Sequence, residues 1–151
     1  MTVKTKLFAA LAASLLLSGF ASAAEFEVKM LNKGTTGAKA AMVFEPDFVK
    51  AALGDTVKFI SVDKGHNVEG IKGMLPDGAD PFKGAVSKDF TLTLAKEGVY
   101  GIKCTPHYGM GMVALISVGV PANIDAAKAV KQPGKAKPNF AALFEQLAAA
   151  Q

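Results

Sequence analysis

Ten residues of this 151-residue chain, KCTPHYGMGM at 103–112, contain its only cysteine, one of its two histidines and two of its six methionines. Cys104, His107 and Met112 follow one another in the spacing C-x₂-H-x₄-M, and the only other histidine is His66. Two imidazoles, a thiolate and a thioether are the ligands of a blue-copper electron-transfer site, in which a His₂Cys plane has a long axial bond to Met. The four residues therefore predict one copper ion per chain.

The mixed ligand set suits an ion that changes oxidation state. Soft sulfur suits Cu(I) and imidazole suits Cu(II), so little rearrangement accompanies the gain or loss of one electron. A structural zinc site would use cysteine, histidine and carboxylate but not thioether. A cysteine nucleophile would need a third group to orient its histidine, and we see none nearby.

Each candidate ligand, taken singly, also has an ordinary structural explanation. A lone cysteine or methionine is commonly a buried hydrophobic residue. In this chain, however, the thiol and both imidazoles fall into the spacing of metal ligands, and this joint pattern favours a metal site. A copper-storage protein without a dedicated redox partner is the alternative, although storage favours several exposed Met or Cys ligands. We expect no enzyme, because two histidines leave no open coordination position or second metal cluster.

The predicted ligands require strands that hold a loop beside a distant strand end. Period-two alternation of apolar residues runs from about residue 24 to 119, as in EFEVKML at 25–31 and DFTLTL at 89–94, and it is typical of half-buried strands. The density of short strands predicts a sandwich or barrel of two antiparallel sheets. Further strands are expected in MVF at 42–44, TVKFISV at 56–62, VYGIKC at 99–104 and MVALISVGV at 112–120.

Beyond Pro121 the composition changes from strand-like to helical. ANIDAAKAVKQ at 122–132 and NFAALFEQLAAA at 139–150 are rich in alanine, contain no Gly or Pro, and are separated by PGKAKP. They predict two short helices that cover one face or edge of the sandwich. The apolar stripes that could pack there are Ile124 and Val130 in the first helix, and Phe140, Leu143 and Leu147 in the second.

The first 23 residues have the pattern of a secretory leader. Lys4 and Lys6 precede an uncharged apolar run that ends in Ala-Ser-Ala, so cleavage is expected before Ala24. We therefore predict a soluble periplasmic protein without a membrane anchor, with residues 24–151 as a single domain whose helices begin at about 122. Without the two leader lysines the count is 17 − 2 = 15 basic against 13 acidic residues, a balance that does not favour nucleic acid.

The stretch EGVYGIKCTPHYGMGM at 97–112 resembles the cupredoxins, in which Gly-x-Tyr leads into Cys-x-Pro-His and then Gly-Met. The x₂/x₄ spacing is shared by plastocyanins and pseudoazurins. VKMLNKG at 28–34, DKGHNVEGIKGMLPDGA at 63–79 and the two-helix tail are similar to the pseudoazurin branch. This resemblance implies an all-β, cupredoxin-like Greek-key β-sandwich with two short C-terminal α-helices.

The resemblance also implies roles for residues around the metal. The backbone N–H of Asn67 would donate to the Cys104 sulfur, and Pro106, which has no N–H, could not add a second such bond. An apolar patch that includes Met110 would surround the exposed edge of His107. A ring of lysines would dock an acidic redox partner, and its members are Lys33, Lys64, Lys83, Lys103 and Lys135.

The resemblance to pseudoazurins also implies that the protein takes part in denitrification. The expected partner is nitrite reductase or nitrous oxide reductase, to which a monomeric carrier would donate one electron at a time. Negative charge is expected on the partner because the predicted docking surface carries lysines.

Overall fold

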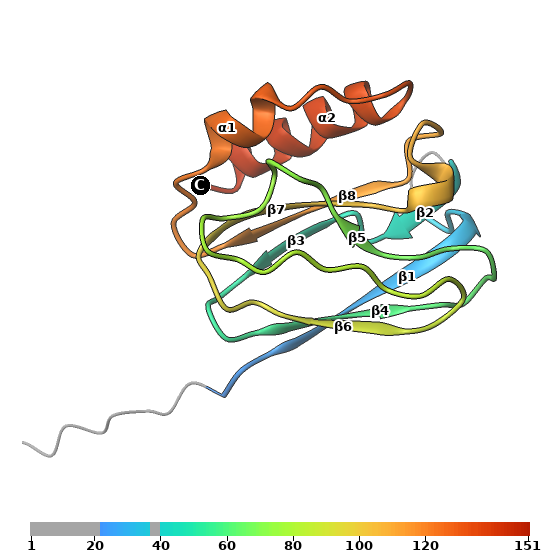
Figure 1. Cartoon of the computed structure of the whole chain (residues 1–151), viewed down its shortest axis with the longest axis horizontal. Coiled ribbons are helices and arrows are strands. Elements are labelled where there is room, and N and C mark those ends of the chain that lie inside the picture. The colour runs from blue at the N-terminus through green and yellow to red at the C-terminus, as the bar shows by residue number, and fades with distance from the viewer. Residues whose placement is uncertain (1–21, 37–39) are drawn as a thin grey trace, which may run out of the picture.

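Apolar side chains that alternate along the strands determine which faces of the two sheets meet. The computed structural model describes residues 22–36 and 40–151, and it consists of two four-stranded sheets with two helices on the outer side of the second (Figure 1). The first sheet has the order β2-β1-β4-β6, with β1 at Glu25–Lys33, β2 at Ala41–Glu45, β4 at Thr56–Ile60 and β6 at Phe90–Thr93. The second has the order β3-β8-β7-β5, with β3 at Phe48–Ala51, β5 at Glu69–Gly70, β7 at Gly98–Lys103 and β8 at Val113–Val118.

The main core lies between the sheets and includes two of the predicted metal ligands. Val28 and Phe59 of the first sheet are buried against Ile102 and Ile116 of the second. Cys104 and Met112 belong to the same buried cluster, so the predicted metal-binding loop is anchored in the core.

Strand β8 is buried along its whole length because both of its faces are covered. Its alternate residues Val113 and Leu115 point away from the main core and pack in a second cluster with Phe140 and Leu147 of the tail. Strands covered on both faces read as continuous apolar runs. The helices therefore complete the second sheet, as the sequence predicted.

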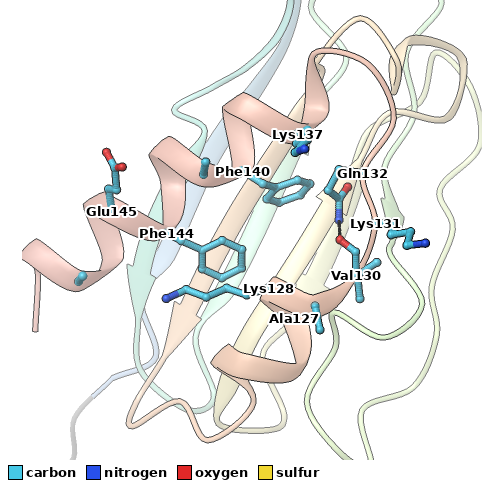
Figure 2. Close-up of a pocket in the computed structure, with 12 residues that line it drawn as sticks. Ala127, Lys128, Val130, Lys131, Gln132, Lys137, Phe140, Phe144 and Glu145 are labelled. Atoms are coloured by element: carbon cyan, nitrogen blue, oxygen red, sulfur yellow. Dashed lines mark hydrogen bonds between the residues drawn. The ribbon is translucent and has the colours of Figure 1, made fainter.

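The two helices differ from their predicted bounds. Helix α1 is Ile124–Ala129 and α2 is Ala136–Ala149, so α2 begins three residues earlier than position 139 and includes Pro138. A proline is tolerated in a first helical turn because the N–H groups there have no intrahelical partner. Figure 2 shows Phe140 and Phe144 on the side of α2 that faces α1 and the sheet; Phe144, which the predicted stripe omitted, is buried there too.

The predicted direction of two strand pairings is wrong. β1 pairs with β4, and β3 with β8, in parallel, whereas the remaining pairings are antiparallel. Period-two alternation tells which face a residue occupies but not which way the neighbouring strand runs. Strands β3 and β5 were not predicted, because runs of four and two residues are too short to show alternation.

The predicted leader falls almost wholly on residues 1–21, outside the part of the chain that the structure describes. Within the described residues, no helix is long and apolar enough to cross a membrane. The described chain enters the first sheet at Ala24, whose backbone N–H donates to Asp55 Oδ1 at 2.8 Å.

The carboxylate of Asp55 makes the stability of the N-terminal end of the first strand dependent on pH. Backbone N–H groups of Ala52 and Ala24 hold the pKa of its carboxyl below the ordinary value of 3.8. The resulting stabilisation is present above that ordinary value and is lost as the pH falls through the lowered pKa of the folded state. We expect Asp55→Asn to lower the melting temperature at neutral pH and to flatten its decline between about pH 5 and pH 3.

Melting curves followed by circular dichroism over this pH range test the prediction. Asp77→Asn, at an exposed turn position, is the matched control and should keep the slope of the unmodified protein. Equal slopes for the Asp55 variant and the unmodified protein would contradict the assignment.

Candidate metal centre

The ligand loop, residues 104–112, connects β7 to β8 and is closed by its own backbone. It begins with a three-residue 3₁₀ helix, Thr105–His107. Cys104 N–H donates to the carbonyl of Met112 at 3.0 Å, and Met112 N–H donates to the carbonyl of His107 at 3.2 Å. These bonds bring the two ends of the loop together, so three of the four predicted ligands lie on one short closed turn.

Three ligand atoms, two from the ligand loop and one from His66, lie close together. His66 Nδ1 lies 3.1 Å from His107 Nδ1, and Cys104 Sγ lies 3.8 Å from the first and 3.5 Å from the second. A first-row metal sits about 2.0–2.3 Å from such ligands, which places neighbouring ligand atoms about 3.3–3.8 Å apart in trigonal or tetrahedral geometry. The two distances to sulfur lie in this range and the 3.1 Å between the two nitrogens is slightly shorter, so the three donors are close enough together to hold one metal ion.

The orientation of His66 is fixed by a residue that the sequence analysis did not identify. Its Nε2–H donates to Asn32 Oδ1 at 3.0 Å, which leaves the lone pair of Nδ1 facing His107 and Cys104. Burial, followed by the nearby His107, lowers the pKa of His66, which favours the neutral ring that metal binding requires. The only sequence signal for Asn32 is its place in the motif VKMLNKG.

The environment of Cys104 opposes a free thiolate. Burial raises the pKa of the thiol, and the backbone N–H groups of Asn67 and His107 act in the opposite direction. A buried thiolate therefore needs a cation as well as these amides. The amide of His107 follows Pro106, which has no N–H to offer.

Asn67 also ties the two parts of the site together through its side chain. Its Oδ1 accepts the Thr105 N–H at 2.8 Å, and its Nδ2 donates to Thr105 Oγ1 at 3.1 Å and to the carbonyl of Gly84 at 3.3 Å. The sequence analysis predicted only its backbone N–H. The side chain joins the segment of His66 to the segment of Cys104 independently of a metal.

The four candidate ligands differ in their access to solvent. His66, Cys104 and Met112 are completely buried, whereas His107 is partly exposed. Around His107, Pro106 is exposed and Met110 keeps 48% of its surface accessible. One ligand edge thus reaches the surface beside an apolar side chain.

The five predicted docking lysines differ in how they are connected to the ligand residues and in whether they have an acidic partner. Lys33 follows Asn32, Lys64 lies two residues before His66, and the Lys135 N–H donates to the carbonyl of Gly109 in the ligand loop at 3.0 Å. All three side chains are exposed.

Lys83 and Lys103 have a carboxylate partner that the sequence analysis missed. Their ammonium groups lie 3.3 Å and 3.6 Å from Glu69, and Lys103 is only 22% exposed. Burial raises the pKa of Glu69, but the hydrogen bond from Thr105 and the two lysines lower it more, so the net shift is downward. Part of the predicted positive charge is therefore neutralised within the protein.

A His₂Cys set in which only His107 is partly exposed, with a buried methionine on the loop that holds Cys104 and His107 in a two-sheet sandwich, defines a blue copper protein, or cupredoxin. Comparison with known proteins agrees. Residues 28–119 match the family described as copper binding proteins, plastocyanin/azurin family.

Several individual relatives within this class are pseudoazurins. The pseudoazurin of Paracoccus pantotrophus is 51% identical over 142 residues, which cover 93% of this chain and 96% of the relative. The crystal structure of pseudoazurin from Methylobacterium extorquens AM1 aligns with a TM-score of 0.77 and 50% identity, covering 82% of this chain and 98% of that one. The pseudoazurin of Hyphomicrobium denitrificans aligns equally well, with a TM-score of 0.77 and 46% identity over 81% of this chain and 97% of that one.

The chain therefore belongs to the plastocyanin/azurin family of copper-binding proteins and, within it, to the pseudoazurins, which are electron-transfer proteins and not enzymes. His66, Cys104, His107 and Met112 are arranged as a type 1 copper site.

Proposed function

We propose that this chain is a monomeric periplasmic carrier that donates single electrons to a denitrification reductase, with nitrite reductase as the first candidate. The observation that carries the proposal is the unequal exposure of the four ligands. Only His107 reaches the surface, beside Pro106 and Met110. A partner can approach this ring edge closely while water is kept from the other three ligands.

The protein residues hold the site so that it changes little during a redox cycle. Copper, when bound, supplies the one-electron couple. Asn32 and Asn67 fix the approach of His66 and of the Cys104 segment. We assign to the backbone N–H of Asn67 the role of stabilising the sulfur charge, which Pro106 cannot share.

Burial of three ligands also supports a carrier over a storage protein. Storage and delivery require ligands that a metal can reach and leave. His66, Cys104 and Met112 are fully buried, and the two imidazoles and the thiol already face one point. Such a preorganised cage favours retention of the ion.

Exposed lysines around His107 support an acidic partner. Lys33, Lys64 and Lys135 are exposed without an acidic partner among the residues that the structure describes, whereas Lys83 and Lys103 share Glu69. We assign most of the long-range attraction to the first three. Lys83 and Lys103 would contribute after contact, when a carboxylate of the partner competes with Glu69.

Periplasmic location rests on the leader predicted over residues 1–23. Cleavage before Ala24 would convert the nitrogen that contacts Asp55 into a charged amine beside a carboxylate. The first strand would thus keep its anchor after processing.

The proposed partner chemistry is tested by mixing the reduced protein with nitrite reductase in a stopped-flow instrument. We expect the second-order rate constant to fall about tenfold from low to high ionic strength, because salt screens steering by the lysines. Lys64→Glu should lower the rate at low salt and weaken its salt dependence. Lys96→Glu makes the same charge change before the opposite end of β7 and should have a much smaller effect.

Two results would count against the proposal. A rate that does not depend on salt would remove the lysines from docking. Absence of electron transfer from the reduced, copper-loaded protein to nitrite reductase at every ionic strength would exclude this enzyme as the partner.

A further inference from the structure

The tail segment, residues 132–139, contacts the ligand loop between two copper ligands. It comprises the end of the connection from α1 and the first turn of α2, and it lies at the same end of the sandwich as the ligand loop (Figure 1). Gln132 belongs to it and lies beside Val130 between the helices (Figure 2). Three loop residues accept or donate a hydrogen bond here: the Tyr108 hydroxyl donates to Gln132 Oε1, the Gly109 carbonyl accepts the Lys135 N–H at 3.0 Å, and the Gly111 carbonyl accepts Asn139 Nδ2–H at 2.8 Å.

Glycines on both sides permit this close approach. Gly111 has φ +96°, and a Cβ placed on it would lie 2.5 Å from Asn139 Nδ2. Gly134 has φ +48°, and its Cβ would lie 2.4 Å from the carbonyl oxygen of Gly109. Real Cβ atoms do not approach so closely, so a larger residue at either position would separate the tail segment from the loop.

The bonded residues lie in the part of the loop between two copper ligands, where a movement of the backbone would change the position of a ligand. They lie between His107 and Met112, two of the residues that would hold the ion, and in blue-copper sites as a class the weak bond to methionine helps to set the potential. Within the described residues, the Gly109 carbonyl accepts a hydrogen bond from the tail segment, and the Gly111 carbonyl accepts one from Asn139 as well as one from the Val113 N–H at 3.0 Å. The loop's own backbone bonds, from the Met110 N–H to the His107 carbonyl at 3.1 Å and from the Gly111 N–H to the Tyr108 carbonyl at 3.0 Å, form its turns, and the tail segment adds bonds to the same stretch from outside the loop.

We propose that Asn139, together with Gln132 and the Lys135 amide, positions the copper-ligand loop, so that the C-terminal helices set the separation of His107 and Met112. The tail thereby acts on the electronic properties of the metal site as well as on the stability of the second sheet. This inference rests on the copper site described above and is independent of which reductase receives the electron.

Two substitutions of one exposed side chain test the proposal. Asn139→Asp keeps the shape of the side chain but removes the N–H donor and places a charge beside the Gly111 carbonyl, and Asn139→Ala removes the contact altogether. Gln146→Ala is the matched control, because Gln146 is also an exposed amide on α2 and makes no side-chain hydrogen bond within the described residues. Both Asn139 variants should fold, since only one surface hydrogen bond is lost.

Three measurements are made on each variant. In the copper-loaded protein we expect both Asn139 variants to change the intensity ratio of the visible charge-transfer bands and to shift the reduction potential. In the metal-free protein we expect amide hydrogens of residues 108–112 to exchange about five- to tenfold faster, as the loss of one net hydrogen bond predicts. Gln146→Ala should leave all three measurements unchanged.

A purely structural role would give a different pattern. The exchange rate would change while the band ratio and the potential stayed at their original values, and that result would overturn the proposal. Equal shifts for Gln146→Ala and Asn139→Ala would overturn it too, because the effect would then belong to the helix surface in general. Since no partner protein enters these measurements, failure of electron transfer to nitrite reductase has no bearing on them.

Discussion

Replacing Cys104 by serine should abolish the intense visible absorption of the oxidised protein while leaving the β-sandwich folded. The absorption of a blue copper site depends on a copper–thiolate bond, and Cys104 is the only cysteine in the chain. A serine hydroxyl is nearly the same size but remains protonated, so it is a poor ligand for the same ion. Copper titrations followed by visible absorption, with far-ultraviolet circular dichroism of the same samples, measure both parts of the prediction.

Thr105→Ser is a suitable control, because it alters the residue next to Cys104 while keeping the hydroxyl that donates to Glu69. It should retain the visible band. The prediction fails if the serine variant of Cys104 stays blue, because the sulfur would then not be the source of the colour. Loss of folded structure in the Cys104 variant would contradict the second part, since the buried residues of both sheets supply the core.

The four ligands could be predicted from the sequence because their chemistry is rare and their spacing is short. One cysteine, one histidine and two methionines fall in a single loop, and only one other histidine is available. The residues that orient them carry no such signal. Asn32 and Glu69 are ordinary polar residues in the sequence, and they matter only because the fold places them against His66 and Thr105.

The fold class was predictable for a similar reason, whereas strand direction was not. Alternation in EFEVKML fixes which residues of β1 face the core, and the same alternation is compatible with either direction of the neighbouring β4. The parallel pairing of β1 with β4 depends on how the chain crosses between the sheets. The start of α2 was mispredicted for a local reason, since Pro138 looks like a helix breaker but lies in the first turn.

Phe140→Ala should lower the free energy of unfolding of the metal-free protein by about 3–5 kcal/mol, the usual cost of removing a buried aromatic ring. The Phe140 side chain is 2% exposed and packs with Val113, Leu115 and Leu147 under α2. Urea unfolding followed by circular dichroism measures the change, and Glu145→Ala, at an exposed position of the same helix, should cost far less. The metal-free form is the right one to use because bound copper would add its own stabilisation.

The shape of the transition tests how the tail is coupled to the sandwich. Strand β8 faces the main core on one side and α2 on the other, so the helices and both sheets should unfold in one cooperative step. In the Phe140 variant the midpoint should then move to lower urea with little change in slope. A separate transition at lower urea, or a loss of unfolding free energy below about 1 kcal/mol, would show that the helices are not coupled to the sheets. The tail segment could not then position the ligand loop.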